Sequence, residues 1–174
     1  MARALGLALG LLTVCLVAAE APSRFATLDG ARVHYKSYGA GKEAVVFIHA
    51  WTCDLTFWRL QAPVYEKRRS LLIDLPGHGA SDKPQVSYTQ ELLARAVAAV
   101  MRDAGVEKAV LVGHSMGAPV AMTLARLYPG KASGLVLVDA FIPRPPKDDA
   151  EREKAKARAA EMAKAYRSPI TRRA

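Results

Sequence analysis

Cysteine is scarce in this 174-residue sequence, which contains only Cys15 and Cys53. Cys15 lies in an N-terminal apolar segment that we expect to be removed, so Cys53 would have no partner for an intrachain disulfide. A small scaffold held together by disulfides is therefore excluded. We interpret Cys53 as a small buried hydrophobic residue rather than a reactive thiol.

Clusters of His, Cys and carboxylate side chains at metal-ligand spacing are missing, and so is a glycine-rich dinucleotide fingerprint. We therefore predict no metal and no other cofactor. The formal net charge of +9 is of the kind seen in nucleic-acid-binding proteins. However, the basic residues after Arg144 alternate with acidic ones, as on a solvated face, and no groove-reading motif accompanies them. We do not expect a nucleic-acid partner, and the sequence carries no signal for an oligomeric state.

The sequence also lacks an apolar run of the ~20 residues that a membrane-spanning helix needs. The stretch from Leu5 to Val17 is shorter, follows the positive charge of Arg3 and precedes several alanines, which is the pattern of an export signal. We predict a signal peptide over residues 1–21, cleaved near 19–21. The mature protein would be periplasmic or secreted, with no stable membrane span. The alternative is a membrane anchor formed by the uncleaved segment.

What the sequence does contain is a regular alternation of apolar runs and helical patterns. The runs are Ala44–Ile48, Ser70–Ile73, Ala109–Val112 and Leu135–Val138, and the helical patterns are Leu55–Tyr65, Thr89–Ala104 and Met116–Leu127. A hairpin signal, Asp29-Gly30, joins two earlier strand candidates, Phe25–Leu28 and Ala31–Tyr38. Strands that alternate with helices indicate an α/β fold with a doubly wound, mostly parallel sheet. Because the runs are apolar throughout, we expect these strands to be buried on both faces.

A change in composition divides the chain after this core. Three prolines between residues 143 and 146 end the α/β pattern, and the following residues are rich in Ala, Lys, Glu and Arg, which favour helix. We predict an α/β core over residues 22–143. Residues 144–174 form a charged helical segment, with the helix over Lys147–Tyr166.

The pentapeptide Gly113-His114-Ser115-Met116-Gly117 has the form G-x-S-x-G and lies between an apolar run and a helical pattern. In this context a sharp strand-to-helix turn exposes the serine oxygen, and small flanking residues allow the backbone to approach closely. The helix N-terminus supplies N–H groups that stabilise negative charge on a substrate oxygen. Ser115 is therefore our candidate nucleophile.

Three segments, Phe47–Trp51, Asp74–Asp82 and Gly113–Gly117, resemble in order and spacing the successive signatures of the α/β-hydrolase superfamily. The resemblance extends from about Phe25 to Pro143. It implies that Ser115 is the nucleophile and that the backbone N–H groups of Trp51 and Met116 form the oxyanion hole. It also makes Asp139 a candidate for the acid of the triad, the alternative being a structural, hydrogen-bonded aspartate. Ala50 stands where the family usually has glycine, so a positive φ there would be strained.

The same resemblance implies that a catalytic histidine should follow Ser115 and the acid in the chain. All four histidines precede Ser115. We interpret His34 as solvated, His49 as a loop-shaping residue and His114 as a packing residue, and we assign no catalytic role to His78 or Asp82. The sequence therefore predicts the N-terminal portion of a hydrolase fold, truncated before its last strands at the start of a helical lid, and inactive by itself.

The resemblance implies a serine hydrolase that cleaves ester or similar acyl bonds of a small molecule through an acyl-enzyme. Dehalogenases and epoxide hydrolases of this superfamily carry Asp at the nucleophile position, so Ser115 argues against both. A haloperoxidase-like enzyme or a carbon–carbon bond hydrolase would also use serine, and both stay open. The alternative from a different class is an incomplete or non-hydrolytic relative that only binds a ligand or partner.

Overall fold

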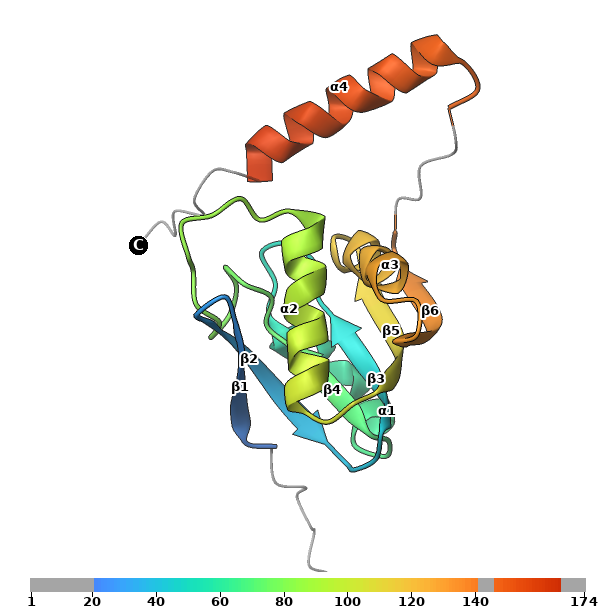
Figure 1. Ribbon diagram of the computed structural model, residues 1–174. Coiled ribbons are helices and arrows are strands. Elements are labelled where there is room, and N and C mark those ends of the chain that lie inside the picture. The colour runs from blue at the N-terminus through green and yellow to red at the C-terminus, as the bar shows by residue number, and fades with distance from the viewer. Residues whose placement is uncertain (1–20, 141–145, 167–174) are drawn as a thin grey trace, which may run out of the picture.

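The computed structural model describes residues 21–140 and 146–166, and within them six strands form one mixed sheet with helices on both faces (Figure 1). The strands are β1 (Ser23–Leu28), β2 (Ala31–Tyr38), β3 (Glu43–Ile48), β4 (Ser70–Ile73), β5 (Lys108–His114) and β6 (Ala132–Val138). The helices are the 3-10 helix η1 (Leu55–Gln61), α1 (Ala62–Tyr65), α2 (Gln90–Asp103), α3 (Gly117–Leu127) and α4 (Asp149–Tyr166). The predicted signal segment, apart from its last residue, and the predicted boundary at residues 143–144 lie outside the described residues.

The strand order across the sheet is β1-β2-β4-β3-β5-β6. Strands β4, β3, β5 and β6 run parallel, whereas β2 pairs antiparallel with both β1 and β4. This arrangement confirms the predicted α/β class and the mostly parallel sheet. The carboxyl ends of the parallel strands meet at one edge, which is where sheets of this kind place their functional residues.

The central strands carry hydrophobic cores on both faces because successive side chains point to opposite sides. On β3, Val46 and Ile48 contribute to the core that includes α2 and α3, whereas Phe47 contributes to the core of η1 and α1. Leu71 and Ile73 of β4 join the first core and Leu72 joins the second. The apolar runs of β3 and β4 therefore lie buried on both faces, as predicted, and hold the carboxyl edge of the sheet rigidly.

The helix predicted over Leu55–Tyr65 is present as two pieces. A 3-10 helix comes first, with the Asp54 side chain accepting a hydrogen bond from the Thr56 N–H at its N-cap. The α-helical turn α1 then begins at Ala62, with Pro63 in its first turn. Proline lacks the N–H that a continuous helix would use and is accommodated in a first helical turn, so the break falls at this position.

Strand β6 departs from the prediction that all four apolar runs are buried on both faces. Its neighbouring residues Leu135 and Val136, which point to opposite faces, are 42% and 46% exposed. Val138 is 39% exposed. Because β6 is the outermost strand of the sheet, it has a paired neighbour on one side only, and its apolar side chains remain in contact with water.

We therefore expect the 174-residue chain to self-associate through β6, because an unpaired apolar edge is a template for pairing with another chain. Val136→Lys is expected to raise the monomeric fraction measured by light scattering after size-exclusion chromatography. Val86→Lys is the matched control, since Val86 is 49% exposed but lies outside every strand and helix. Equal monomeric fractions for both variants, or a wild-type chain that is already monodisperse and monomeric, would contradict this expectation.

Helix α4 contributes nothing to either core in its described part. Every described side chain from Asp149 to Glu161 is exposed, and ion pairs such as Arg152–Asp149 and Lys156–Glu153 lie along its surface. This confirms a charged helix close to the predicted bounds of Lys147–Tyr166. Throughout residues 21–140 and 146–166, no helix combines the length and the apolar character that a bilayer crossing requires.

Candidate active site

Ser115 occupies a strained, exposed turn between β5 and α3. Its φ of +49° is in the left-handed region, which non-glycine residues adopt at a cost of order 1–3 kcal/mol, and its side chain is exposed. The glycines on either side permit this turn. A Cβ at Gly113 would lie 2.7 Å from the Cα of Ala118, and one at Gly117 would collide with the carbonyl oxygen of Ile48. The G-x-S-x-G sequence thus forms the predicted strand-to-helix turn.

Hydrogen bonds fix this turn from both sides. The N–H of Ser115 donates to the carbonyl oxygen of Val138 at 3.0 Å, and the carbonyl oxygen of Ser115 accepts from the N–H of Ala118 at 3.0 Å. The first bond ties the residue to the end of β6, and the second ties it to the first turn of α3. Met116 stands at the N-cap of α3 and is 5% exposed, so its position is set by packing as well.

The segment that carries Trp51 follows directly from β3 and lies against the same turn. A Cβ at Gly117 would approach the carbonyl oxygen of His49 to 2.9 Å, so the N-terminus of α3 lies directly against the end of β3. Ala50 is not among the described residues with positive φ, whereas Thr52 has a φ of +62°. The strain considered for Ala50 is therefore located at Thr52, within the turn closed by the Cys53 N–H donating to the Ala50 carbonyl oxygen. Trp51 is 37% exposed beside it.

Asp139 lies next to Ser115 across the sheet. The register pairs His114, the last residue of β5, with Val138, the last residue of β6. Ser115 and Asp139 therefore directly follow paired residues on two neighbouring strands, and neighbouring strands in a sheet are about 4.8 Å apart. Asp139 also has a positive φ, +46°, and its side chain is exposed. Within residues 21–140 and 146–166 the Asp139 side chain forms no hydrogen bond or ion pair, and its role as acid of the triad or as structural aspartate stays a prediction.

His49 holds the segment after β3 to the segment after β4. Its side chain is fully buried; Nδ1 donates to the Ala50 carbonyl oxygen at 2.7 Å, and Nε2 accepts from the Leu75 N–H at 3.0 Å. Both nitrogens are thus used by one neutral tautomer. Burial lowers the pKa of His49 from 6.5 to about 4, with the bond to Ala50 opposing the shift. These contacts confirm the interpretation of His49 as a loop-shaping residue.

The low pKa of His49 makes folding stability depend on pH. Between pH 6.5 and 4 the unfolded chain binds a proton that the folded chain does not, so stability is full above pH 6.5 and falls as the pH decreases towards 4. The loss is on the order of 3 kcal/mol. Urea unfolding at pH 7.5 and pH 4.5 should show it, and His49→Gln should flatten the dependence more than His78→Gln. An NMR titration that finds His49 protonated at pH 6 would contradict the assignment.

His34 is buried at 5% exposure, which corrects the expectation that it is solvated. Its Nδ1 lies 2.8 Å from Oδ2 of Asp74, and its Nε2 lies 2.9 Å from Oγ of Ser23. The expectation failed because side chains of the neighbouring strand β1 and the segment that follows β4 enclose His34. Asp74 also accepts hydrogen bonds from the N–H groups of Leu55 and Ala80, so it joins β2 and the start of η1 to the segment Asp74–Asp82. The sequence analysis did not predict these buried hydrogen bonds of Asp74. The position of an Asp directly after an apolar run is a signal that could have indicated them.

The remaining histidines are also held in place. Nδ1 of His78 lies 3.1 Å from the Pro76 carbonyl oxygen, and burial lowers the pKa of His78. His114 stacks on Phe57 with ring centroids 4.6 Å apart and planes within 7°, which confirms its packing role. None of the four histidines is hydrogen-bonded to Ser115 in the part of the chain that is described. No group of three or more possible metal ligands occurs among these residues either.

Comparison with known proteins assigns the chain to a family. Over residues 43–173 the sequence matches the family described as the alpha/beta hydrolase fold. The chain belongs to this α/β-hydrolase family. The matched residues include the strand–turn–helix around Ser115.

Relatives of known name differ in what they do. An acetyltransferase component of an acetoin cleaving system from Cupriavidus necator is 40% identical over 121 residues, which is 69% of this chain and 32% of that protein. A 2-hydroxy-6-oxononadienedioate/2-hydroxy-6-oxononatrienedioate hydrolase from Paraburkholderia phymatum is 35% identical over 127 residues, 66% of this chain and 44% of that protein. The structure of Est816, an N-acyl homoserine lactone degrading enzyme, aligns with a TM-score of 0.66 and 26% identity over 86% of this chain and 66% of that one. The chain thus spans less than half the length of the two curated relatives.

Proposed function

We propose that this chain carries the nucleophile of a serine hydrolase that cleaves ester or similar acyl bonds of a small molecule. The observation that carries the proposal is the exposed Ser115 at φ +49° between two glycines whose missing side chains make room for the turn. Such strain persists only where the surrounding structure enforces it, and it is concentrated at functional sites. A serine placed in this way can attack an acyl carbon and form an acyl-enzyme.

The oxyanion that forms on attack would be bound by the backbone N–H groups of Met116 and Trp51. Met116 begins helix α3, where the aligned peptide dipoles favour negative charge. Trp51 follows the end of β3, which lies against Gly117. Two donors on rigid elements bind a developing charge without reorganisation, and the loss of one typically costs about 10²–10³ in rate.

Asp139 is the proposed acid of the triad, supported by its place beside Ser115 and by its own positive φ. The base is proposed to come from residues that follow Ala174 in a longer protein. In this chain all four histidines precede Ser115, and the contacts described above hold each of them elsewhere. Because a serine hydroxyl is a weak nucleophile without a base, the 174-residue chain alone should be inactive. We also propose that residues 1–21 direct export of the protein, as the sequence pattern predicts.

A second candidate function is binding or transfer without hydrolysis. The observation that favours it is the 40% identity to an acetyltransferase component, which is higher than the 35% identity to the hydrolase from Paraburkholderia phymatum. An acyl-enzyme formed on Ser115 would serve either outcome, because water and another acceptor compete for the same intermediate. Hydrolysis and transfer therefore differ in the acceptor and share the nucleophile, whereas binding alone would not require an activated Ser115.

A fluorophosphonate probe tests the proposal, because it labels only an activated serine. A chain extended beyond Ala174 by its natural sequence should be labelled at Ser115, as read by mass spectrometry of the modified peptide. The 174-residue chain should show labelling near background. An extended, folded chain that stays unlabelled at Ser115 would refute the hydrolase proposal and leave the binding alternative.

A further inference from the structure

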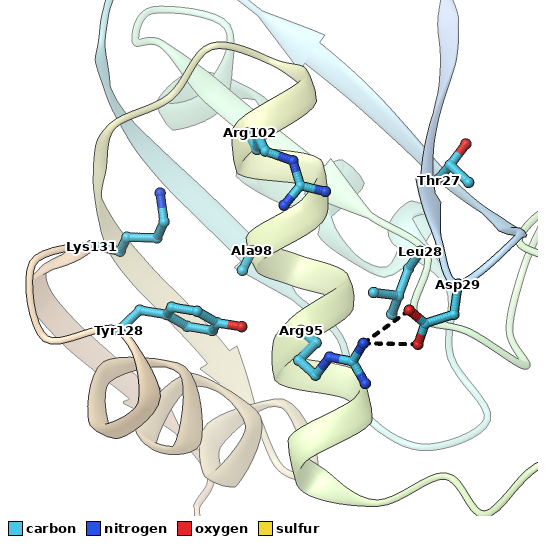
Figure 2. Close-up of a pocket in the computed structure, with 8 residues that line it drawn as sticks. All are labelled: Thr27, Leu28, Asp29, Arg95, Ala98, Arg102, Tyr128 and Lys131. Atoms are coloured by element: carbon cyan, nitrogen blue, oxygen red, sulfur yellow. Dashed lines mark hydrogen bonds and ion pairs between the residues drawn. The ribbon is translucent and has the colours of Figure 1, made fainter.

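A cavity of about 310 Å³ lies away from Ser115, between the turn that follows β1, helix α2 and the turn that follows α3. Figure 2 shows residues from all three segments around it. Arg95, Ala98 and Arg102 recur at helical spacing on one face of α2, and Asp29, Tyr128 and Lys131 come from the two turns. The small side chain of Ala98 leaves room between the two longer arginines. The volume is at the lower end of the roughly 300–1,000 Å³ typical of small-molecule sites.

Hydrogen bonds within the protein hold both turns that border the cavity. Tyr128 and Lys131 are the first and fourth residues of a turn closed by the Lys131 N–H donating to the Tyr128 carbonyl oxygen at 2.9 Å. The Lys131 carbonyl oxygen then accepts from the Ala109 N–H at 2.8 Å, which ties the turn to β5. On the opposite side, Arg95 donates two hydrogen bonds to the carboxylate of Asp29, at 2.9 and 2.8 Å. The walls are therefore held in place without a ligand.

The charges around this cavity do not cancel. Arg95 and Asp29 neutralise one another in their paired hydrogen bonds (Figure 2). Arg102 and Lys131 form no side-chain hydrogen bond or ion pair with any residue within 21–140 and 146–166. Two positive charges and the hydroxyl of Tyr128 consequently border one cavity with a single carboxylate that is already paired. Such an arrangement favours an anion that carries about two negative charges.

We propose that this cavity binds a small phosphate-type anion with two or more negative charges through Arg102, Lys131 and the hydroxyl of Tyr128. An arginine fork and a lysine ammonium are the side chains that recognise phosphate oxygens. The site is separate from the nucleophile, because Ser115 precedes α3 and Tyr128 follows it, and the 11 residues of α3 span about 16 Å. The inference is independent of the hydrolase proposal, since neither its residues nor its test involve Ser115.

Isothermal titration of the 174-residue chain with inorganic pyrophosphate, at constant ionic strength, tests the site. The wild-type chain is expected to bind one equivalent with a Kd below 1 mM. Lys131→Ala and Arg102→Gln are each expected to weaken binding about 10-fold or more, because each removes a charged hydrogen-bond donor. Tyr128→Phe, which keeps the ring and removes only the hydroxyl, is expected to weaken it several-fold. The control Arg126→Gln removes the same charge from α3, where Arg126 forms an exposed ion pair with Glu91 of α2, and should leave the Kd unchanged.

Three results would overturn the proposal. The first is the absence of saturable pyrophosphate binding up to 10 mM by a wild-type chain whose circular dichroism shows it to be folded. The second is an equal loss in Arg126→Gln, which would indicate attraction by net charge alone. The third is binding of citrate with the affinity expected for pyrophosphate, which would assign the cavity to carboxylates.

Discussion

Ser115→Ala is expected to lower kcat/KM for an activated ester by on the order of 10⁴–10⁶-fold in a chain extended beyond Ala174. On the proposed mechanism, the substitution removes the atom that would form the acyl-enzyme bond and leaves the rest of the site in place. The small remaining rate would come from the oxyanion donors and from binding. Alanine fits the same space, and the two hydrogen bonds that fix the turn involve backbone atoms only, so the fold should be unaffected.

The matched control is Ser87→Ala, which removes an exposed hydroxyl from a loop. Stopped-flow or steady-state assays with a p-nitrophenyl ester give the measurement, with urea unfolding of both variants as the check on folding. Retention of more than a tenth of the activity by a folded Ser115→Ala variant would exclude Ser115 as the nucleophile. In the 174-residue chain, wild type and Ser115→Ala should hydrolyse the ester at the same background rate.

Gly117→Ala is expected to destabilise the fold by about 3 kcal/mol. The added carbon would meet backbone, not side chain: the carbonyl oxygen of Ile48 and, at 2.9 Å, that of His49. Backbone at the centre of a sheet cannot rotate away as a side chain does. Helix α3 would have to withdraw from the end of β3, taking the Ser115 turn with it.

Gly130→Ala provides the comparison, because it adds the same methyl where nothing lies within 4 Å and where φ is outside the left-handed region. Its effect should stay below about 1 kcal/mol. Urea unfolding followed by tryptophan fluorescence measures both, since Trp58 is buried in the core of η1 and α1. Similar unfolding midpoints for the two variants would show that α3 does not depend on the close approach at Gly117.

Local patterns were sufficient to predict most of the fold. The apolar runs at β3 and β4 and the helix predicted over Thr89–Ala104 follow directly from residue spacing. The turn at Ser115 was predictable for the same reason, since two glycines and a serine at fixed spacing describe a geometry. These features depend on residues that are close together in the sequence, so they can be predicted without a structure.

The features that sequence reasoning missed depend on distant segments. His34 alternates with apolar residues along β2 and so looks solvated, but its ring contacts Asp74 after β4 and Ser23 of β1, which lie far from it in the sequence. The exposure of Leu135 and Val136 depends on β6 having no second neighbour in the sheet. Likewise, Tyr128 and Lys131 meet Arg102 at one cavity only because α2 and α3 pack side by side. Residue periodicity along the chain does not predict these contacts between distant segments.

The hydrogen bond from the Ser115 N–H to the Val138 carbonyl oxygen links two regions of unequal local stability. Strand β5 lies inside the sheet, whereas β6 is its outermost, partly uncovered strand, and such strands open by local unfolding more readily than the core. Each opening of β6 releases the backbone of Ser115 on one side. We therefore expect the time for which Ser115 stays aligned to depend on the local stability of β6, and a surface that covers β6 to lengthen it.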